Sequence, residues 1–140
     1  MWKYTYIDHT ADLGVKITAD SKEEIYQAAA LILYENLISL DKIRLKKKIR
    51  IRITGKDYDQ LLFNILKKLL EYYNINRFVG KQVDIDLLKK DSLCITVSGD
   101  FLKEEIPLHL YKHEIKTITY HGLHIKKSGK KFTTNVIFDI

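Results

Sequence analysis

Aspartates near both ends of this 140-residue chain are the side chains best placed to bind a cation. Asp8 and Asp12 flank a short connection between two expected strands, and Asp139 ends the final expected strand, just before Ile140. Functional residues gather at strand ends, so the carboxylates meet if the last strand pairs near the first. Together with the terminal carboxylate of Ile140 they offer hard oxygen ligands, which suit Ca²⁺ or Mg²⁺. Isolated aspartates are also common turn formers, so spacing alone leaves both interpretations open.

Four of the five histidines fall within LHLYKHEIKTITYHGLHI, residues 108–125. His109 and His113 have the spacing of zinc ligands on one helical turn, but Pro107 and the following β-branched residues favour extended chain. We therefore do not predict a zinc site. A strand over 114–126 would place alternate side chains on opposite faces. One face would carry Glu114, Lys116, Ile118 and Tyr120, and the other Ile115, Thr117, Thr119 and His121.

A basic segment, DKIRLKKKIRIRI, places seven cations within residues 41–53. Arg50 and Arg52 would project from one face of a strand, where they could follow a phosphate backbone. Lysines on an exposed edge strand also prevent edge-to-edge aggregation, and no glycine and aromatic RNA-stacking motif accompanies the segment. The segment therefore fits either an RNA contact or a solvated edge.

Composition narrows the class of protein. The net charge of +6, with 46% hydrophobic and 30% charged residues, is typical of a globular protein that meets RNA or acidic surfaces. Cys94 is the single cysteine, so we expect no internal disulfide and a cytoplasmic location. No apolar stretch is long enough to span a bilayer, and no glycine-rich phosphate loop or nucleophile elbow occurs. A self-contained enzyme is not indicated.

Two segments have helical periodicity and caps. A capping box at Ser21 and Glu24 starts a helix predicted over 22–38, and Asp57 with Gln60 starts another within 57–75. The other regular segments alternate as strands do, over 2–7, 13–19, 49–54, 82–88, 92–102, 114–126 and 131–140. We therefore predict one α+β domain over 1–140, in two layers, with two helices packed on a largely antiparallel or mixed sheet.

The segments YIDHTADLGV, HEIKTITYHGLHI and the terminal VIFDI in combination resemble the archease family. The resemblance covers the whole chain and includes the helix beginning SKEE and the segment DQLLFNILKKLL. One departure is HLYKHEIK, where family members often have a proline before the Glu-Ile-Lys segment.

The resemblance implies a metal-binding accessory factor that is not itself an enzyme. Archeases promote guanylylation and multiple turnover of the RtcB-type tRNA-splicing ligase, and they broaden the nucleotides that the ligase uses. The family's ligands for Ca²⁺ or Mg²⁺ map onto Asp12, Asp139 and Ile140, with Asp8 as a supporting carboxylate. Motif residues expected near the same site are His9, Lys116, Tyr120 and His121.

The implied partner is the ligase, with at most a weak contact to tRNA and none to a membrane. Two alternative functions remain open at this point. The basic segment 41–53 would suit an RNA-binding module or a chaperone of RNA-processing enzymes. The aspartates and histidines would suit a metal-dependent hydrolase.

Overall fold

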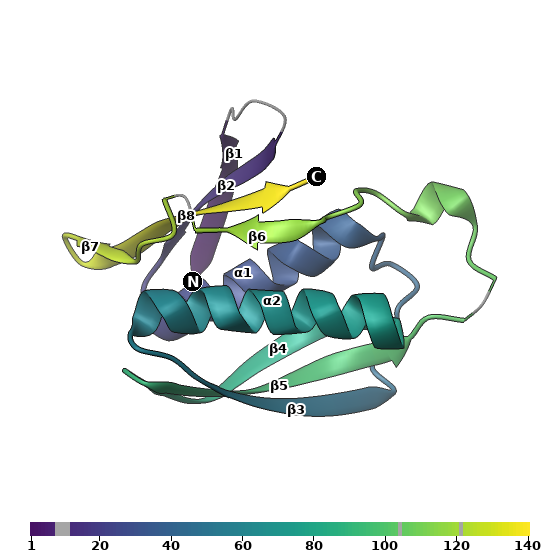
Figure 1. The fold of residues 1–140 in the computed structure, drawn as a ribbon, viewed down its shortest axis with the longest axis horizontal. Coiled ribbons are helices and arrows are strands. Elements are labelled where there is room, and N and C mark those ends of the chain that lie inside the picture. The colour runs from purple at the N-terminus through teal and green to yellow at the C-terminus, as the bar shows by residue number, and fades with distance from the viewer. Residues whose placement is uncertain (8–11, 104, 121) are drawn as a thin grey trace.

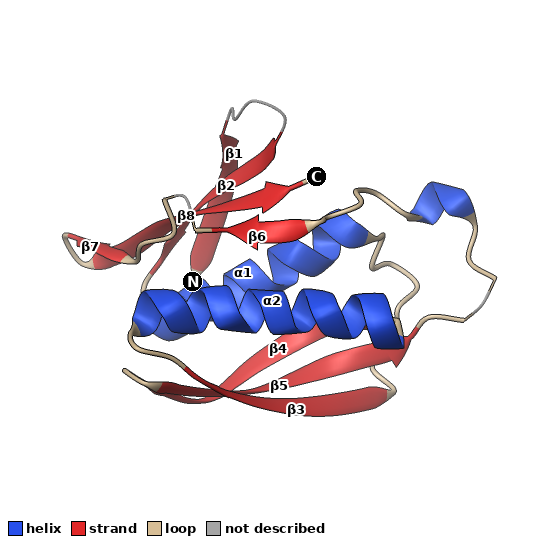
Figure 2. Cartoon of the chain, in the orientation of Figure 1, coloured by secondary structure: helices blue, strands red, loops and turns tan. Residues whose placement is uncertain are grey.

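The structure is a computed structural model of the chain, and it describes residues 1–7, 12–103, 105–120 and 122–140. Figures 1 and 2 show how its helices and strands are arranged. In chain order the elements are β1 (Trp2–Ile7), β2 (Asp12–Ala19), α1 (Lys22–Leu37), β3 (Lys47–Thr54), α2 (Tyr58–Asn76), β4 (Phe78–Lys89), β5 (Ser92–Phe101), a 3₁₀ turn (Leu108–Leu110), β6 (Thr117–Thr119), β7 (Lys126–Ser128) and β8 (Lys131–Asp139).

Both predicted helices are confirmed, and local capping sets where they begin. The Ser21 hydroxyl accepts a hydrogen bond from the backbone N–H of Glu24 at 3.2 Å, and Asp57 accepts one from Gln60 at 2.8 Å. These side chains satisfy backbone donors that the first helical turn leaves unpaired. Helix α2 ends at Arg77, which takes the left-handed conformation at φ 62°.

The α+β class and the antiparallel pairing are confirmed, but the strands form two sheets where we predicted one. One sheet has the order β1-β2-β8-β6, with β7 also pairing with β8, and the other has the order β3-β5-β4. Both helices lie between the sheets, so the described chain has three layers (Figure 1). Each sheet covers one side of the helical layer.

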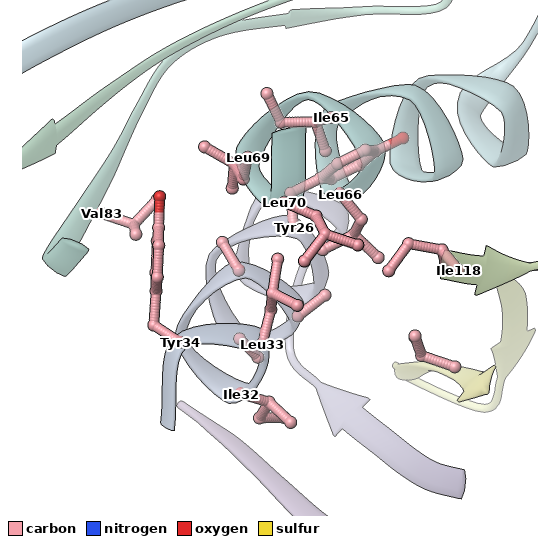
Figure 3. Packing of buried hydrophobic residues seen from close by; sticks show 14 of the residues in the cluster. Tyr26, Ile32, Leu33, Tyr34, Ile65, Leu66, Leu69, Leu70, Val83 and Ile118 are labelled. Carbon is pink, nitrogen blue, oxygen red and sulfur yellow. The ribbon is translucent and has the colours of Figure 1, made fainter. Parts of the chain in front are cut away.

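The core fills the helical layer from both sides. Helix α1 is buried over most of its circumference, as expected for a helix enclosed by two sheets, whereas α2 buries one stripe. Figure 3 shows Leu33 and Tyr26 of α1 near Leu66 and Leu70 of α2, with Ile118 of β6 pointing toward them. This packing fixes β6 against α2.

The predicted continuous strand over 114–126 is wrong. Among the described residues of this segment, strand pairing is limited to β6 and to Lys126, the first residue of β7. The preceding residues instead bind the end of α1, where His113 donates its backbone N–H to Asn36 at 2.9 Å and Lys112 donates to Leu37 at 3.1 Å. Gly122 then turns the chain with φ 69°. The β-branched pattern of the segment therefore gives a strand only where β8 serves as the partner strand.

Candidate functional site

Two of the predicted metal ligands lie directly opposite each other. Asp12, at the start of β2, and Asp139, at the end of β8, are register partners in an antiparallel pair. Such partners have Cβ atoms about 4.5–5.5 Å apart and project from the same face of the sheet. The fold therefore brings together carboxylates from the two ends of the sequence.

A third strand extends this row. Thr117 of β6 is the partner of Asp139 on its other side, so Asp139 lies between Asp12 and Thr117. The backbone N–H of Lys116 donates to the backbone carbonyl of Asp139 at 2.7 Å. The end of β8 is thus held from both sides, which fixes the direction of the Asp139 side chain.

Within this row, Asp12 and Asp139 face away from the helices. The next row across the same strands is Leu13, Phe138 and Ile118, and both Phe138 and Ile118 are buried in the core. Since side chains alternate along a strand, the carboxylates of Asp12 and Asp139 project from the outer face of the sheet. A ligand or partner protein can approach them there.

The donor set suits a hard divalent cation. Like charges placed directly opposite each other destabilise a strand pair, and a bound cation reverses that repulsion. The two aspartate carboxylates are oxygen donors, and the predicted ligand set adds the carboxylate of Ile140, the residue after Asp139. Among the described residues no group of three or more His, Cys, Asp or Glu side chains gathers as a metal site, so the set needs the terminal carboxylate or further oxygen ligands.

Three of the predicted site residues, Asp8, His9 and His121, lie outside the described residues. Of the two predicted motif residues that the structure describes, Lys116 has an exposed side chain that lines a groove against α2 together with Lys67, Glu71 and Asn74. Its backbone contacts Asp139, but its side chain belongs to the side of the sheet that faces the helices.

Tyr120 also contacts α2. Its ring stacks on Phe63, with centroids 3.8 Å apart and an interplanar angle of 17°, and 54% of the residue stays exposed. Lys116, Ile118 and Tyr120 all lie toward α2. Thr117, which was predicted on the opposite face, lines the same groove as Lys116, so the predicted division into two faces is not confirmed. Sequence reasoning missed Phe63, which is part of the apolar helical pattern and carries no separate signal.

The loop after Tyr120 is anchored at the start of α2. One carboxylate oxygen of Asp59 accepts from the backbone N–H of Ile125 at 2.8 Å, and the other contacts Nδ1 of His124. Asp59 lies in the first turn of α2, where the helix dipole favours a negative charge. His124 thus has a structural contact, and His109 and His113 are exposed.

The basic segment 41–53 is divided by the fold. Lys42, Arg44 and Lys46 line a groove of about 300 Å³ before β3, together with apolar residues that include Phe101 and Pro107. Lys48, Arg50 and Arg52 alternate with part-buried isoleucines along β3, an edge strand of its sheet. Arg50 lies 3.8 Å from Asp86 of β4. The seven cations therefore do not form one continuous phosphate track.

A membrane-spanning helix is absent from the described chain, since neither helix combines the necessary length and apolar character.

Comparison with known proteins gives a consistent result. The chain matches the Archease protein family (MTH1598/TM1083) over residues 4–140. The archease of Pyrococcus abyssi is 31% identical over 91% of this chain and 90% of its own length. That of Archaeoglobus fulgidus is 27% identical over 99% of both chains.

Solved structures agree with the fold. The solution structure of protein 1598 from Methanobacterium thermoautotrophicum has a TM-score of 0.82 at 27% identity and covers 98% of both chains. The crystal structure of an archease from Thermotoga maritima, 22% identical, has a TM-score of 0.67 over 96% of this chain and 94% of that chain. The family match extends over nearly the whole sequence and includes both strands that carry the paired aspartates, so this chain belongs to the archease family.

Proposed function

We propose that this protein is a metal-binding accessory factor that prepares an RtcB-type tRNA-splicing ligase for repeated turnover and is not an enzyme itself. The observation that carries the proposal is the direct pairing of Asp12 with Asp139 on the outer face of the sheet. Together with family membership, this pairing supports an anionic site for a cation on a face that another protein could contact. The accessory role, the ligase and the cation together form the proposal.

In this proposal the chain's own residues position the ligands. The strand pairs on both sides of β8 hold Asp139 in place, and Asp12 is held by its pairing with β8. The carboxylate of Ile140 follows directly and supplies a third oxygen group. A Ca²⁺ or Mg²⁺ ion bound there would offer positive charge to oxyanions such as those of a ligase-bound nucleotide.

The function is tested by ligation in a large excess of RNA over the cognate ligase, with labelled GTP and a divalent cation. A small fraction of one equivalent of wild-type protein should convert a single turnover into many and should speed up labelling of the ligase. Asp12→Ala should fail to do so while remaining folded, because it lacks one of the paired ligands. No label should accumulate on this chain.

A matched control is Asp84→Ala, which removes an exposed aspartate from β4 in the other sheet and should stimulate ligation normally. If Asp12→Ala stimulates as well as wild type, the metal-centred mechanism is wrong. Label on this chain would instead indicate an enzyme.

The role of the terminus has its own test. Adding one glycine after Ile140 moves the terminal carboxylate by about 3.8 Å, which is far beyond the tolerance of a metal–ligand bond. We expect weaker binding of Ca²⁺ by calorimetry and little change in the thermal unfolding midpoint. Unchanged affinity would remove Ile140 from the ligand set and leave the aspartate pair in place.

A further inference from the structure

Helix α2 separates two grooves that share part of their lining. One groove, of about 560 Å³, lies toward β3 and is lined by Arg52, Asn64, Lys67, Lys68 and Glu71, among others. The other, of about 320 Å³, lies toward β6 and shares Lys67 and Glu71 with the first. Figure 1 shows β3 and β6 on opposite sides of α2. The exposed face of α2 is therefore a ridge between two grooves that share lining residues.

The charge of these grooves is strongly positive. They contain four cations, Arg52, Lys67, Lys68 and Lys116, against one carboxylate, Glu71. Glu71 lies 3.9 Å from Lys68, and the other three cations make no ion pair within the described residues. Exposed cations without a carboxylate partner attract polyanions. The surface thus favours a ligand that carries several negative charges in a row.

An aromatic surface lies beside the cations. The stacked rings of Phe63 and Tyr120 are next to Lys67, whose Nζ is 5.5 Å from the centroid of the Phe63 ring. About half of Tyr120 is exposed, so a planar group can stack on it. A row of cations beside an exposed aromatic ring is the combination that binds single strands, with phosphates on the cations and a base on the ring. An acidic peptide would use the charge but not the ring.

We propose that the α2 ridge, defined by Arg52, Lys67, Lys68, Lys116 and Tyr120, binds single-stranded nucleic acid. The cations contact the phosphates, and Tyr120, supported by Phe63, stacks on an unpaired base. Binding is independent of base sequence, because the ridge offers charge and one ring rather than side chains aimed at base edges. The proposal goes beyond the accessory function, since it requires neither the ligase nor a divalent cation.

The test measures binding of a labelled oligouridylate of about 12 nucleotides by fluorescence anisotropy, with EDTA present so that the aspartate pair plays no part. Neutralising one phosphate of a single strand contributes a slope of about −0.7 to the dependence of log affinity on log salt. We expect a slope of about −3 for wild type. The double variant Lys67→Gln/Lys68→Gln should reduce the slope to about −1.5 and weaken binding at least tenfold at about 50 mM salt.

The matched control is Lys89→Gln/Lys90→Gln, which changes another Lys-Lys pair, at the exposed β4–β5 turn, and removes the same charge. It should bind within twofold of wild type. Tyr120→Phe should also bind within twofold, because it keeps the ring. Tyr120→Ala should weaken binding at least fivefold, the lower end of what one stacked base contributes.

Three results would overturn the proposal. An equal loss of affinity in the two double lysine variants would mean that binding depends on the net charge of the protein and not on the ridge. A duplex of the same length bound as tightly as the single strand would exclude stacking on Tyr120. Oligoglutamate bound as tightly as RNA, and weakened by Lys67→Gln/Lys68→Gln, would assign the ridge to an acidic protein partner.

Discussion

Two individual residues carry the proposed cation site, because strand register places Asp12 and Asp139 opposite each other. The predicted effect of Asp139→Asn on the free energy of unfolding therefore has opposite signs without and with the metal. In EDTA, Asp139→Asn should raise the free energy of unfolding by about 0.5 kcal/mol, since one of two opposed like charges is removed. With Ca²⁺ at about one hundred times its dissociation constant, wild type should gain about 2.7 kcal/mol and the variant much less. Urea unfolding in both conditions measures the difference.

The control for this prediction is Asp84→Asn, on an exposed position of the other sheet. It should gain the same stability from Ca²⁺ as wild type. A Ca²⁺ gain of equal size in wild type and Asp139→Asn would show that the ion binds elsewhere.

Two buried tyrosines of α1 differ in one hydrogen bond. Tyr26 donates its hydroxyl to the backbone carbonyl of Tyr58, whereas the Tyr34 hydroxyl has no partner among the described residues. Burial raises the pKa of both phenols, so neither ionises near neutral pH. Tyr26→Phe should lower the free energy of unfolding by about 1–2 kcal/mol, and Tyr34→Phe should leave it unchanged or raise it by up to about 1 kcal/mol.

Denaturant titrations of the two variants at pH 7 provide the comparison, and each serves as the control for the other. Equal destabilisation by both substitutions would mean that the Tyr34 hydroxyl has a partner in solution.

At the scale of elements, β4 and β5 come unusually close at Gly99. A Cβ placed on Gly99 would lie 1.9 Å from the carbonyl oxygen of Val79, which is backbone and cannot move aside. Gly99→Ala should therefore lower the free energy of unfolding by about 3 kcal/mol. Gly129→Ala is the comparison, because Gly129 has φ 62° and open space around it, so its cost should be about 1 kcal/mol. Thermal unfolding that ranks the two variants in the opposite order would contradict the close approach.

How well each element could be predicted from sequence depends on how local its contacts are. Both helices were predictable, because the caps at Ser21 and Asp57 and the apolar stripe of α2 are short-range signals. The division into two sheets was not predictable, because strand pairing joins distant segments and an alternating pattern does not identify the partner strand. Residues 114–126 were mispredicted for the same reason, because among their described residues only Thr117–Thr119 and, from Lys126 onward, β7 pair with β8.

Parts of the candidate site could likewise be predicted from the sequence, and other parts could not. The aspartate pair could be anticipated from the two ends of the sequence, and strand register confirms that Asp12 and Asp139 meet. The contact of Tyr120 with Phe63 could not be anticipated, because in the sequence Phe63 is one apolar residue among many in a helix. The position of the Lys116 side chain against α2 likewise depends on how β6 packs on that helix.

At the scale of the whole molecule, one ion-pair cluster joins distant segments. Asp20, just before α1, contacts Lys131 at the start of β8 and the N-terminal amine. The Lys131 ammonium, followed by the amine, lowers the pKa of Asp20 to about 2. A carboxyl whose pKa is lower in the folded state stabilises the fold above its unfolded pKa of about 3.9, and loses that contribution as pH falls through about 2.

The expected result is that Asp20→Asn is less stable than wild type at pH 5 and that the difference shrinks by pH 2. Thermal unfolding midpoints at both pH values measure it, and Lys131→Met should behave similarly because it removes the main cause of the pKa shift. If the difference in unfolding midpoint between wild type and Asp20→Asn stays constant between pH 5 and pH 2, the ion pair is contradicted.

The central position of β8 has a consequence for biosynthesis. This strand lies between β2 and β6 and also pairs with β7, yet the ribosome makes it after every other described element. Domains fold as their segments emerge, so the helices and the β3-β5-β4 sheet can begin to assemble while β2 still lacks its neighbour. A nascent or truncated polypeptide that ends before β8 therefore carries Asp12 without Asp139. The pairing of the two aspartates is therefore acquired only after β8 has been made.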